Sequence, residues 1–285
     1  MLATMGRLEP LRRLFASLEG QLEVGDCIAI ATTGDQYRVG ELVKSFRFPD
    51  GCVTLTASPK GASTARNLAA ASLATKVDFL LFPNDTSWFA SGFVKTFRGL
   101  DLTGSCGALE VVDEKGPKFL LPEAGTPLSK ANVWQVIEPG LFIKCSTFFE
   151  LGGFNEDFGT GAPTPWQSGE GTELLVRWMD RYDPQSFEWI HKLKVYGISD
   201  PFGLSALQRR RKLRAYARGY GRLLITGGFS GRKRIEAALG GWLFGLRKGA
   251  PYKAVDGLWV GLGRLEGMTG VVLSGAHSSV RAVDQ

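Results

Sequence analysis

The sequence has few cysteines, and none of them belongs to a metal-binding or disulfide pattern. Four cysteines occur among 285 residues, far apart, without a CxxC pair or a cysteine and histidine spacing that suits zinc. We therefore expect neither a zinc site nor a disulfide framework, but reduced and mostly buried thiols of a cytosolic protein. The four are Cys27, Cys52, Cys106 and Cys145.

Long apolar runs are also missing. No stretch approaches the roughly 18 consecutive apolar residues that suggest a membrane-spanning helix. The N-terminal stretch MLATMGRLEPLRR lacks the order of basic region, apolar core and small-residue cleavage site that marks a signal peptide. Together these absences predict a chain that stays in the cytoplasm.

The composition excludes several classes of protein. Apolar residues make up 44% of the chain and charged residues 22%, which is typical of a globular protein and not of a disordered, collagen-like or low-complexity one. The length suits one large α/β domain, or a smaller domain with an appendage. We find no internal repeat.

Positive charge is concentrated in one segment. The net charge is +6, but residues 204–253 contain thirteen lysines and arginines and one acid, Glu236, so this segment carries +12 and the rest of the chain −6. Its first part has helical spacing, with Tyr216 and Tyr220 along it. A basic amphipathic helix suits an anionic membrane surface or an anionic glycan carrier. The alternatives are a solvated helical face and, ranked below it, nonspecific nucleic-acid binding.

Short apolar runs alternate with helical patterns over the first hundred residues. This alternation predicts right-handed crossovers and a mixed, mostly parallel sheet flanked by helices, with ligands beyond the carboxyl ends of the strands. Strands are expected at residues 1–5 (unusually short), 26–31, 52–56 and 77–82, and helices from about residue 9, at 39–46 and, with a Ser or Thr cap, at 64–74.

The pattern changes after residue 104. We expect a hairpin over 106–121, strands at 136–144 and 187–196, and a helix at 170–181. Three helical segments follow residue 204, with breaks at 227–228 and 249–251. The chain thus divides into a predicted domain over 1–203 and a basic helical extension over 204–285.

The stretch FLLFPNDTSW places polar residues at the end of an apolar run. Residues 79–82 read as a fully buried strand within a parallel sheet, and Asn84 and Asp85 follow its carboxyl end. A carboxylate and an amide oxygen there suit Mg²⁺ or Mn²⁺ bound to substrate phosphates. The alternative is a turn in which Asp85 caps the next helix, and the two roles are compatible.

Two other loops carry candidate functional residues. The loop 60–67 joins a strand to a helix, so its backbone amides and Arg66 suit an anionic ligand. A loop rich in Gly, Pro and Trp ends at Glu170, which suits a general base for a hydroxyl nucleophile. Alternatively, Glu170 compensates helix charge, with Glu173 in a capping arrangement.

Four stretches together resemble a known family. In order they are GASTARNLAAA, FLLFPNDTSW, EPGLFIKCSTFFELGGFNEDFGTGA and SGEGTELLVR. This series resembles the motifs of family-2 glycosyltransferases of the GT-A fold, and the resemblance covers residues 2–200. The resemblance implies a GT-A-like fold and inverting transfer of a sugar from a nucleotide diphosphate donor to a hydroxyl acceptor. It also implies a glycan or lipid-linked acceptor in cell-surface or extracellular polysaccharide synthesis, at the cytoplasmic face of the membrane.

The resemblance also assigns roles to individual residues. Asp85 matches the last acid of the DxD-like metal motif and would hold Mn²⁺ or Mg²⁺, and Glu170 matches the acid that serves as base. The residues matching donor-binding positions are Thr4, Arg7, Arg66, Asn67, Asn84 and Asp85.

The sequence departs from the family pattern at three places. Asp85 is the only acid of its motif, Ala31–Thr33 stands where an acid usually reads the nucleobase, and Gly171 follows Glu170 where an Asp is usual. The single acid of the metal motif and the short first strand keep a second hypothesis open, a non-catalytic relative that binds a nucleotide or glycan without turnover. A third is a basic nucleic-acid-binding protein, whose affinity would fall steeply with salt.

Overall fold

The computed structural model describes residues 1–74, 76–197, 204–246 and 252–273. The chain forms two compact units. The first comprises Met1–Phe154 and Leu174–Asp200, and the second comprises Asn155–Glu173 and Pro201–Gln285. The second unit thus includes a loop that the predicted boundary at residue 203 assigns to the N-terminal part. That division into domains stays a prediction.

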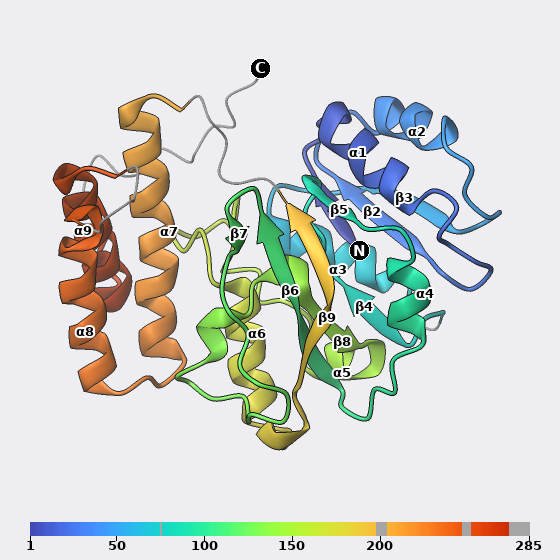
Figure 1. Cartoon of the computed structure of the whole chain (residues 1–285). Coiled ribbons are helices and arrows are strands. Elements are labelled where there is room, and N and C mark those ends of the chain that lie inside the picture. The colour runs from blue at the N-terminus through green and yellow to red at the C-terminus, as the bar shows by residue number, and fades with distance from the viewer. Residues whose placement is uncertain (75, 198–203, 247–251, 274–285) are drawn as a thin grey trace. The chain divides into compact units, whose positions relative to one another are not determined.

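The strands and helices follow the predicted alternation over the first hundred residues (Figure 1). The strands are β1 (Leu2–Thr4), β2 (Ile28–Thr32), β3 (Val53–Ala57), β4 (Phe79–Leu81), β5 (Ser87–Phe89), β6 (Cys106–Asp113), β7 (Gly116–Pro117), β8 (Leu141–Lys144) and β9 (Glu188–Gly197). The helices are α1 (Leu8–Leu18), α2 (Gln36–Lys44), α3 (Ala62–Ala71), α4 (Phe93–Arg98), α5 (Cys145–Glu150), α6 (Glu170–Met179), α7 (Ala206–Thr226), α8 (Gly231–Trp242) and α9 (Ala254–Thr269).

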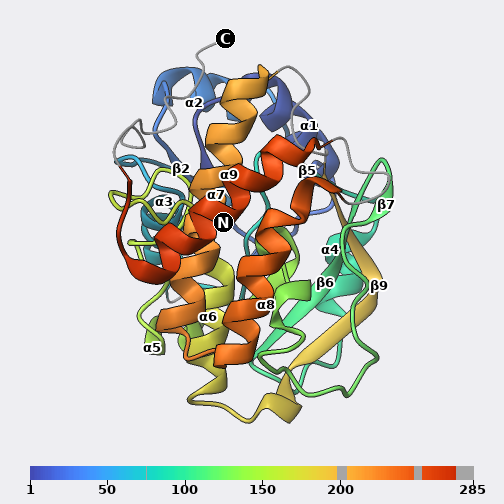
Figure 2. The same cartoon turned by 90° about the vertical axis from the view of Figure 1, so that its left-hand side faces the viewer.

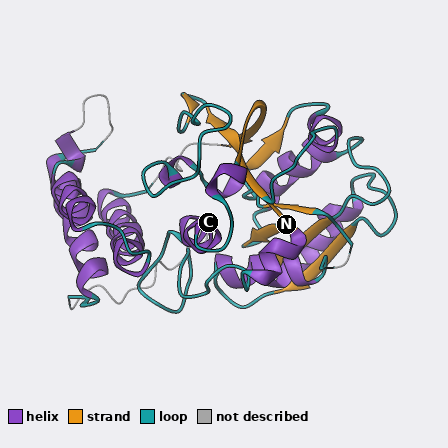
Figure 3. Ribbon diagram, turned by 90° about the horizontal axis from the view of Figure 1, so that it is seen from below, coloured by secondary structure: helices purple, strands orange, loops and turns teal. Residues whose placement is uncertain are grey.

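The first sheet is parallel, with the order β1-β2-β3. All five side chains of β2 are buried, and large and small residues alternate along it. Ile28 and Ile30 join the core formed with α1 and α2, whereas the small Ala29 and Ala31 leave room for α3 on the other face. Helices therefore cover both faces of this sheet (Figures 1 and 3), as expected of a parallel sheet.

The second sheet makes the fold mixed. Its order is β4-β8-β6-β9-β5, with β7 beside β6, and the pairs are antiparallel except β6 with β9. The expectation that β4 lies within the parallel sheet and is fully buried is wrong. Its ladder partner is the antiparallel β8, and Phe79 and Leu81 are half-buried while Leu80 is buried. Along its other edge, the nitrogen of Met1 donates to the carbonyl of Leu81 at 2.7 Å.

Several predicted boundaries need correction. The N-cap of α3 is Gly61 (φ 125°), with no side-chain cap, instead of a Ser or Thr. The hairpin after β6 is confirmed, but its second strand is only Gly116–Pro117. The strand expected at 136–144 begins at Leu141, because the short 3-10 helices η1 (Val133–Gln135) and η2 (Glu138–Gly140) precede it.

The second unit contains α7, α8 and α9, and α9 packs against both other helices (Figure 2). The predicted break at 227–228 is confirmed, whereas the break at 249–251 lies outside the described residues. Glycine allows α7 and α9 to approach closely, because a Cβ on Gly267 would lie 2.1 Å from the carbonyl oxygen of Arg218. No helix in the described part of the chain has both the length and the apolar character needed to span a membrane.

Candidate functional site

The candidate site lies in the first unit, where β1 and β4 reach their carboxyl ends. Thr4 is the last residue of β1, and Pro83-Asn84-Asp85 follows β4. The Thr4 hydroxyl donates a hydrogen bond of 2.9 Å to Oδ2 of Asp85 and accepts one from the amide of Gly6. Thr4 and Asp85 are both 5% exposed, so the bond joins the two strand ends beneath the surface.

Arg7 completes the surroundings of Asp85. Its Nη2 lies 2.5 Å from Oδ1 and its Nε lies 3.3 Å from Oδ2, so the guanidinium contacts both oxygens of the carboxylate. Such a fork fixes direction as well as distance. Arg7 keeps 47% of its side chain exposed, which leaves part of its charge available to a ligand.

Arg66 brings a second positive charge to the same strand end. It lies on α3, is 5% exposed, and its Nη2 donates to Oδ1 of Asn84 at 3.2 Å. Asn84 is fixed in turn by Ser87, whose Oγ accepts from the Asn84 amide at 3.1 Å. Sequence reasoning missed Ser87, which is 2% exposed. Its position three residues after Asn84 is the local signal for such a turn.

Asn67 holds a neighbouring loop. Its Nδ2 donates to the carbonyl of Phe154, and its Oδ1 accepts from the amide of Phe154, both at 2.9 Å. Both ends of the Asn67 side chain therefore contact the backbone. The donor-binding role predicted for Asn67 stays a prediction, and its described contacts are those of a residue that positions the loop at Phe154.

Two turns lie close together beside Thr4. The amide of Thr33 donates to the carbonyl of Thr4 at 3.0 Å, and a Cβ on Gly34 would lie only 2.1 Å from the carbonyl oxygen of Met5. Glycine is therefore required at position 34 for the turns after β1 and β2 to meet. Sequence reasoning missed Gly34, although its place directly after a strand end was a signal for close backbone approach.

The predicted divalent ion can be tested against these contacts. Asp85 supplies one carboxylate, both of whose oxygens already accept bonds from Arg7 and Thr4. Among the described residues, no group of three or more His, Cys, Asp or Glu side chains forms a metal site. These side chains alone therefore do not complete the coordination of a divalent ion. An ion on Asp85 would have to draw ligands from phosphate and water and share the carboxylate with Arg7.

Glu170 belongs to the second unit. It is the first residue of α6 and is 7% exposed. The loop before it packs on α7, where the Ser168 hydroxyl donates to the carbonyl of Tyr216 at 2.7 Å. The structure thus places Glu170 after a loop anchored to a helix, which suits a positioned acid.

Solved structures of other proteins share the architecture of this chain. No family model and no curated protein sequence matches the chain, but solved structures do. The crystal structure of Staphylococcus aureus TarS 1–349 aligns over 94% of this chain and 71% of that chain, with a TM-score of 0.56 and 10% identity. Its complexes with UDP-GlcNAc and with UDP align over 94% and 95% of this chain and 90% of those chains, with TM-scores of 0.55 and 0.54 and 12% identity.

These likenesses concern the fold. TarS is a GT-A-type glycosyltransferase, and this chain has a mixed α/β fold of the same GT-A-like kind. At such low identity the comparison carries no residue roles. Membership of family 2 within this fold stays a prediction.

Proposed function

We propose that this chain is a glycosyltransferase that takes a sugar from a nucleotide diphosphate donor. One observation carries the proposal: Arg7, which contacts Asp85, and Arg66, which contacts Asn84, both lie at the carboxyl end of β4, and α/β folds bind ligands beyond the carboxyl ends of their strands. Two guanidinium groups against one carboxylate favour an anionic ligand such as a diphosphate. TarS, which has the same kind of fold, has been crystallised with UDP-GlcNAc and with UDP.

In this proposal the arginines act on the leaving group. Negative charge develops on the diphosphate as the sugar departs, and fixed positive groups stabilise it most when they need not reorganise. Asp85 and Thr4 would hold Arg7 in place for that purpose. Mn²⁺ or Mg²⁺ on Asp85 stays a prediction that the binding experiment below addresses.

The acceptor side of the proposal rests on Glu170. As a general base it would take the proton of an acceptor hydroxyl, and the hydroxyl would attack the anomeric carbon with inversion. The acceptor class, a glycan or lipid-linked glycan of a cell-surface or extracellular polysaccharide, follows from the family resemblance alone. It remains part of the proposal.

Calorimetric titration with a panel of nucleotide sugars, with and without Mn²⁺, tests the donor site. The variants are Asp85→Ala and Arg7→Met, each checked for folding by circular dichroism. Binding that needs Mn²⁺ and is lost in Asp85→Ala makes Asp85 a metal ligand. Binding that persists without metal and is lost in Arg7→Met assigns charge neutralisation to the arginines.

A different outcome would favour the non-catalytic hypothesis. The single acid in the metal motif and its engagement by Arg7 are the observations that keep it open. Donor binding without any transfer to glycan acceptors would support it. A folded protein that binds no nucleotide sugar under any condition would overturn the proposed function.

A further inference from the structure

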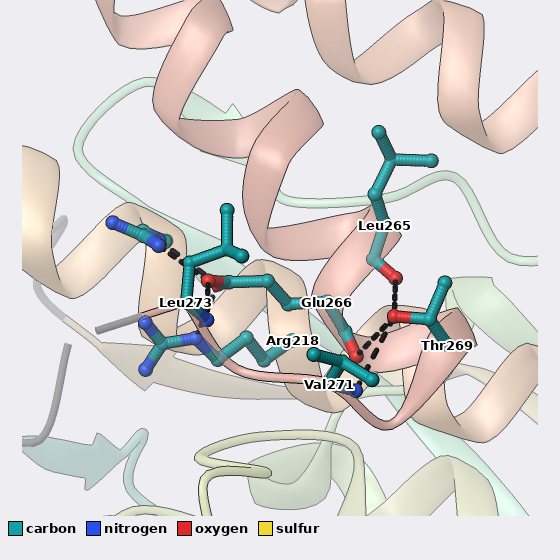
Figure 4. Close-up of polar contacts among 7 residues, drawn as sticks. Arg218, Leu265, Glu266, Thr269, Val271 and Leu273 are labelled. Atoms are coloured by element: carbon teal, nitrogen blue, oxygen red, sulfur yellow. Dashed lines mark hydrogen bonds and ion pairs between the residues drawn. The ribbon is translucent and has the colours of Figure 1, made fainter.

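The arginines of α7 that suggested a charged docking face are largely engaged inside the second unit. Nε of Arg214 and Nε of Arg218 donate to Oε2 of Glu266 on α9, at 2.9 and 2.7 Å, and the amide of Leu273 donates to Oε1 at 2.9 Å. Figure 4 shows the Glu266 carboxylate in contact with Arg218 and with the backbone of Leu273. Glu266 is 2% exposed, so these bonds lie between the helices.

A second carboxylate repeats this arrangement near the start of α9. Asp256 is fully buried and accepts from Nη2 of Arg209 and from Nε of Arg210, both at 3.1 Å, and from the amide of Lys253 at 2.8 Å. The charge count over 204–253 ended before both acids. Four arginines of α7 are thus bound to two buried acids of α9, so these arginines do not form the free charged face that the charge count suggested.

The outward side of α8 exposes large apolar side chains. Five large side chains recur at spacings of three and four residues along α8 and the following 3-10 helix η4 (Phe244–Leu246), which places them on one helical face. Ile235 is 64% exposed and Leu239 is 59% exposed, and the small Ala237 and Gly241 occupy the buried side. The five are Ile235, Leu239, Trp242, Leu243 and Leu246.

Helix α9 also has a shorter stripe of exposed apolar side chains. Val255, Leu258 and Leu265 are all exposed, at spacings that again follow one helical face. Isolated exposed leucines need no explanation, but two neighbouring helices that each expose a stripe suggest an interaction surface. We call the five residues of α8 and η4 and the three of α9 the apolar stripes.

The charges beside the apolar stripes are positive. Every acid on α8 and α9 is bound by arginine: Asp256 and Glu266 as above, and Glu236 by Nε of Arg232 at 2.9 Å. Lys233 and Arg234 lie in the first turn of α8, and Lys253 is exposed directly before α9. The described surface of these two helices therefore combines apolar side chains with an excess of positive charge.

We propose that the apolar stripes and their flanking basic residues dock on the surface of a bilayer containing anionic lipids. An amphipathic helix of this kind lies in the interface, with its apolar side chains among the acyl chains and its basic side chains at the headgroups. A second copy of the chain fits less well, because it would bring the same positive charges together. Nucleic acid offers phosphates but no apolar layer for the leucines and Trp242. This inference goes beyond sugar transfer and does not depend on it.

Vesicle sedimentation of the full chain tests the proposal. The probes are vesicles of phosphatidylcholine alone and of phosphatidylcholine with an equal part of phosphatidylglycerol. Leu239→Ser with Leu243→Ser removes exposed apolar contacts, and Lys233→Gln removes one charge. The matched control is Leu120→Ser, at a leucine of the first unit that is 74% exposed.

We expect the chain to bind the mixed vesicles more tightly than the neutral ones. The double serine variant should bind at least tenfold more weakly, Lys233→Gln about fivefold more weakly, and Leu120→Ser unchanged. Equal binding by wild type and double variant, or no binding to either vesicle, would overturn the proposal. So would a dimer in sedimentation velocity that the double variant dissociates, because a second copy would then cover the stripes.

Discussion

Arg7 and Asp85 are separated by 78 positions in the sequence, yet the guanidinium of one contacts both carboxylate oxygens of the other. The pair joins the turn after β1 to the turn after β4, and Thr4 donates to the same carboxylate. This contact turns two separate strand ends into one polar site. The predictions below begin with it.

Replacement of Arg7 should impair donor binding without unfolding the chain. Arg7→Met removes a charged group that is half exposed, and we expect affinity for the bound nucleotide sugar to fall about tenfold or more, because hydrogen bonds to charged groups contribute about 1.5–3 kcal/mol. Arg7→Lys should recover only part of it, since an ammonium lacks the planar fork that matches the two oxygens of a carboxylate. Arg12→Met, at an exposed position of the same helix, is the control, and calorimetry is the measurement.

Glu170→Gln should separate binding from chemistry. If Glu170 is the base, the variant binds donor as wild type does and transfers sugar about 100-fold more slowly or worse. Glu173→Gln, three residues later on α6, should leave transfer near the wild-type rate. Single-turnover kinetics provide the measurement, and loss of folding in Glu170→Gln would instead point to a structural role at the start of the helix.

Asn67→Ala should destabilise the first unit. It removes both bonds to the Phe154 backbone and leaves that amide and carbonyl without their partner, which costs about 1–3 kcal/mol per polar group left buried. Urea denaturation measures the free energy of unfolding. If stability is unchanged and donor affinity falls, Asn67 contacts the donor, as the family resemblance implies.

The buried acids of α9 should make stability depend on pH. Burial alone would raise the pKa of Glu266, but hydrogen bonds from Arg214, Arg218 and the Leu273 amide outweigh it and hold the pKa below its ordinary value of 4.5. A carboxylate with a lowered folded pKa stabilises the protein above its unfolded pKa. That stabilisation is lost as the pH falls below about 4.5 and through the folded value.

Glu266→Gln tests this dependence. The variant should lose about 3–5 kcal/mol near neutral pH, because two arginines lose their buried partner, and its stability should change less on acidification than that of the wild type. Glu236→Gln is the control, since its pair with Arg232 is exposed and contributes about 1 kcal/mol at most. Thermal unfolding at several pH values measures both. Parallel pH profiles for Glu266→Gln and wild type would contradict the prediction.

Local patterns in the sequence predicted most elements of the fold. Helical spacing located α1, α6 and the helices after residue 204, helix propensity located α3, and apolar runs before turn residues located β2, β3 and β4. Pairing was harder to predict. The partner of β4 is β8, some sixty residues later in the chain, and an apolar run of a few residues carries no information about which strand lies beside it.

For the candidate site, the sequence could name candidate residues but not the contacts between them. Polar residues after an apolar run identified Asn84 and Asp85, and the loop between a strand and a helix identified Arg66. The family resemblance added Thr4, Arg7 and Asn67. The sequence could not show that Arg7 occupies both oxygens of Asp85. That contact depends on the angle at which the turn after β1 meets the end of β4.

The C-terminal helices show the same division between sequence and structure. By itself the sequence determined that basic segments with helical spacing follow residue 204, because charge and periodicity are local properties. Only the tertiary structure decided which charges face solvent. Packing of α9 on α7 buries Asp256 and Glu266 against four arginines. Helix α8 packs one of its sides on α9, and its leucines lie on another side, which is exposed.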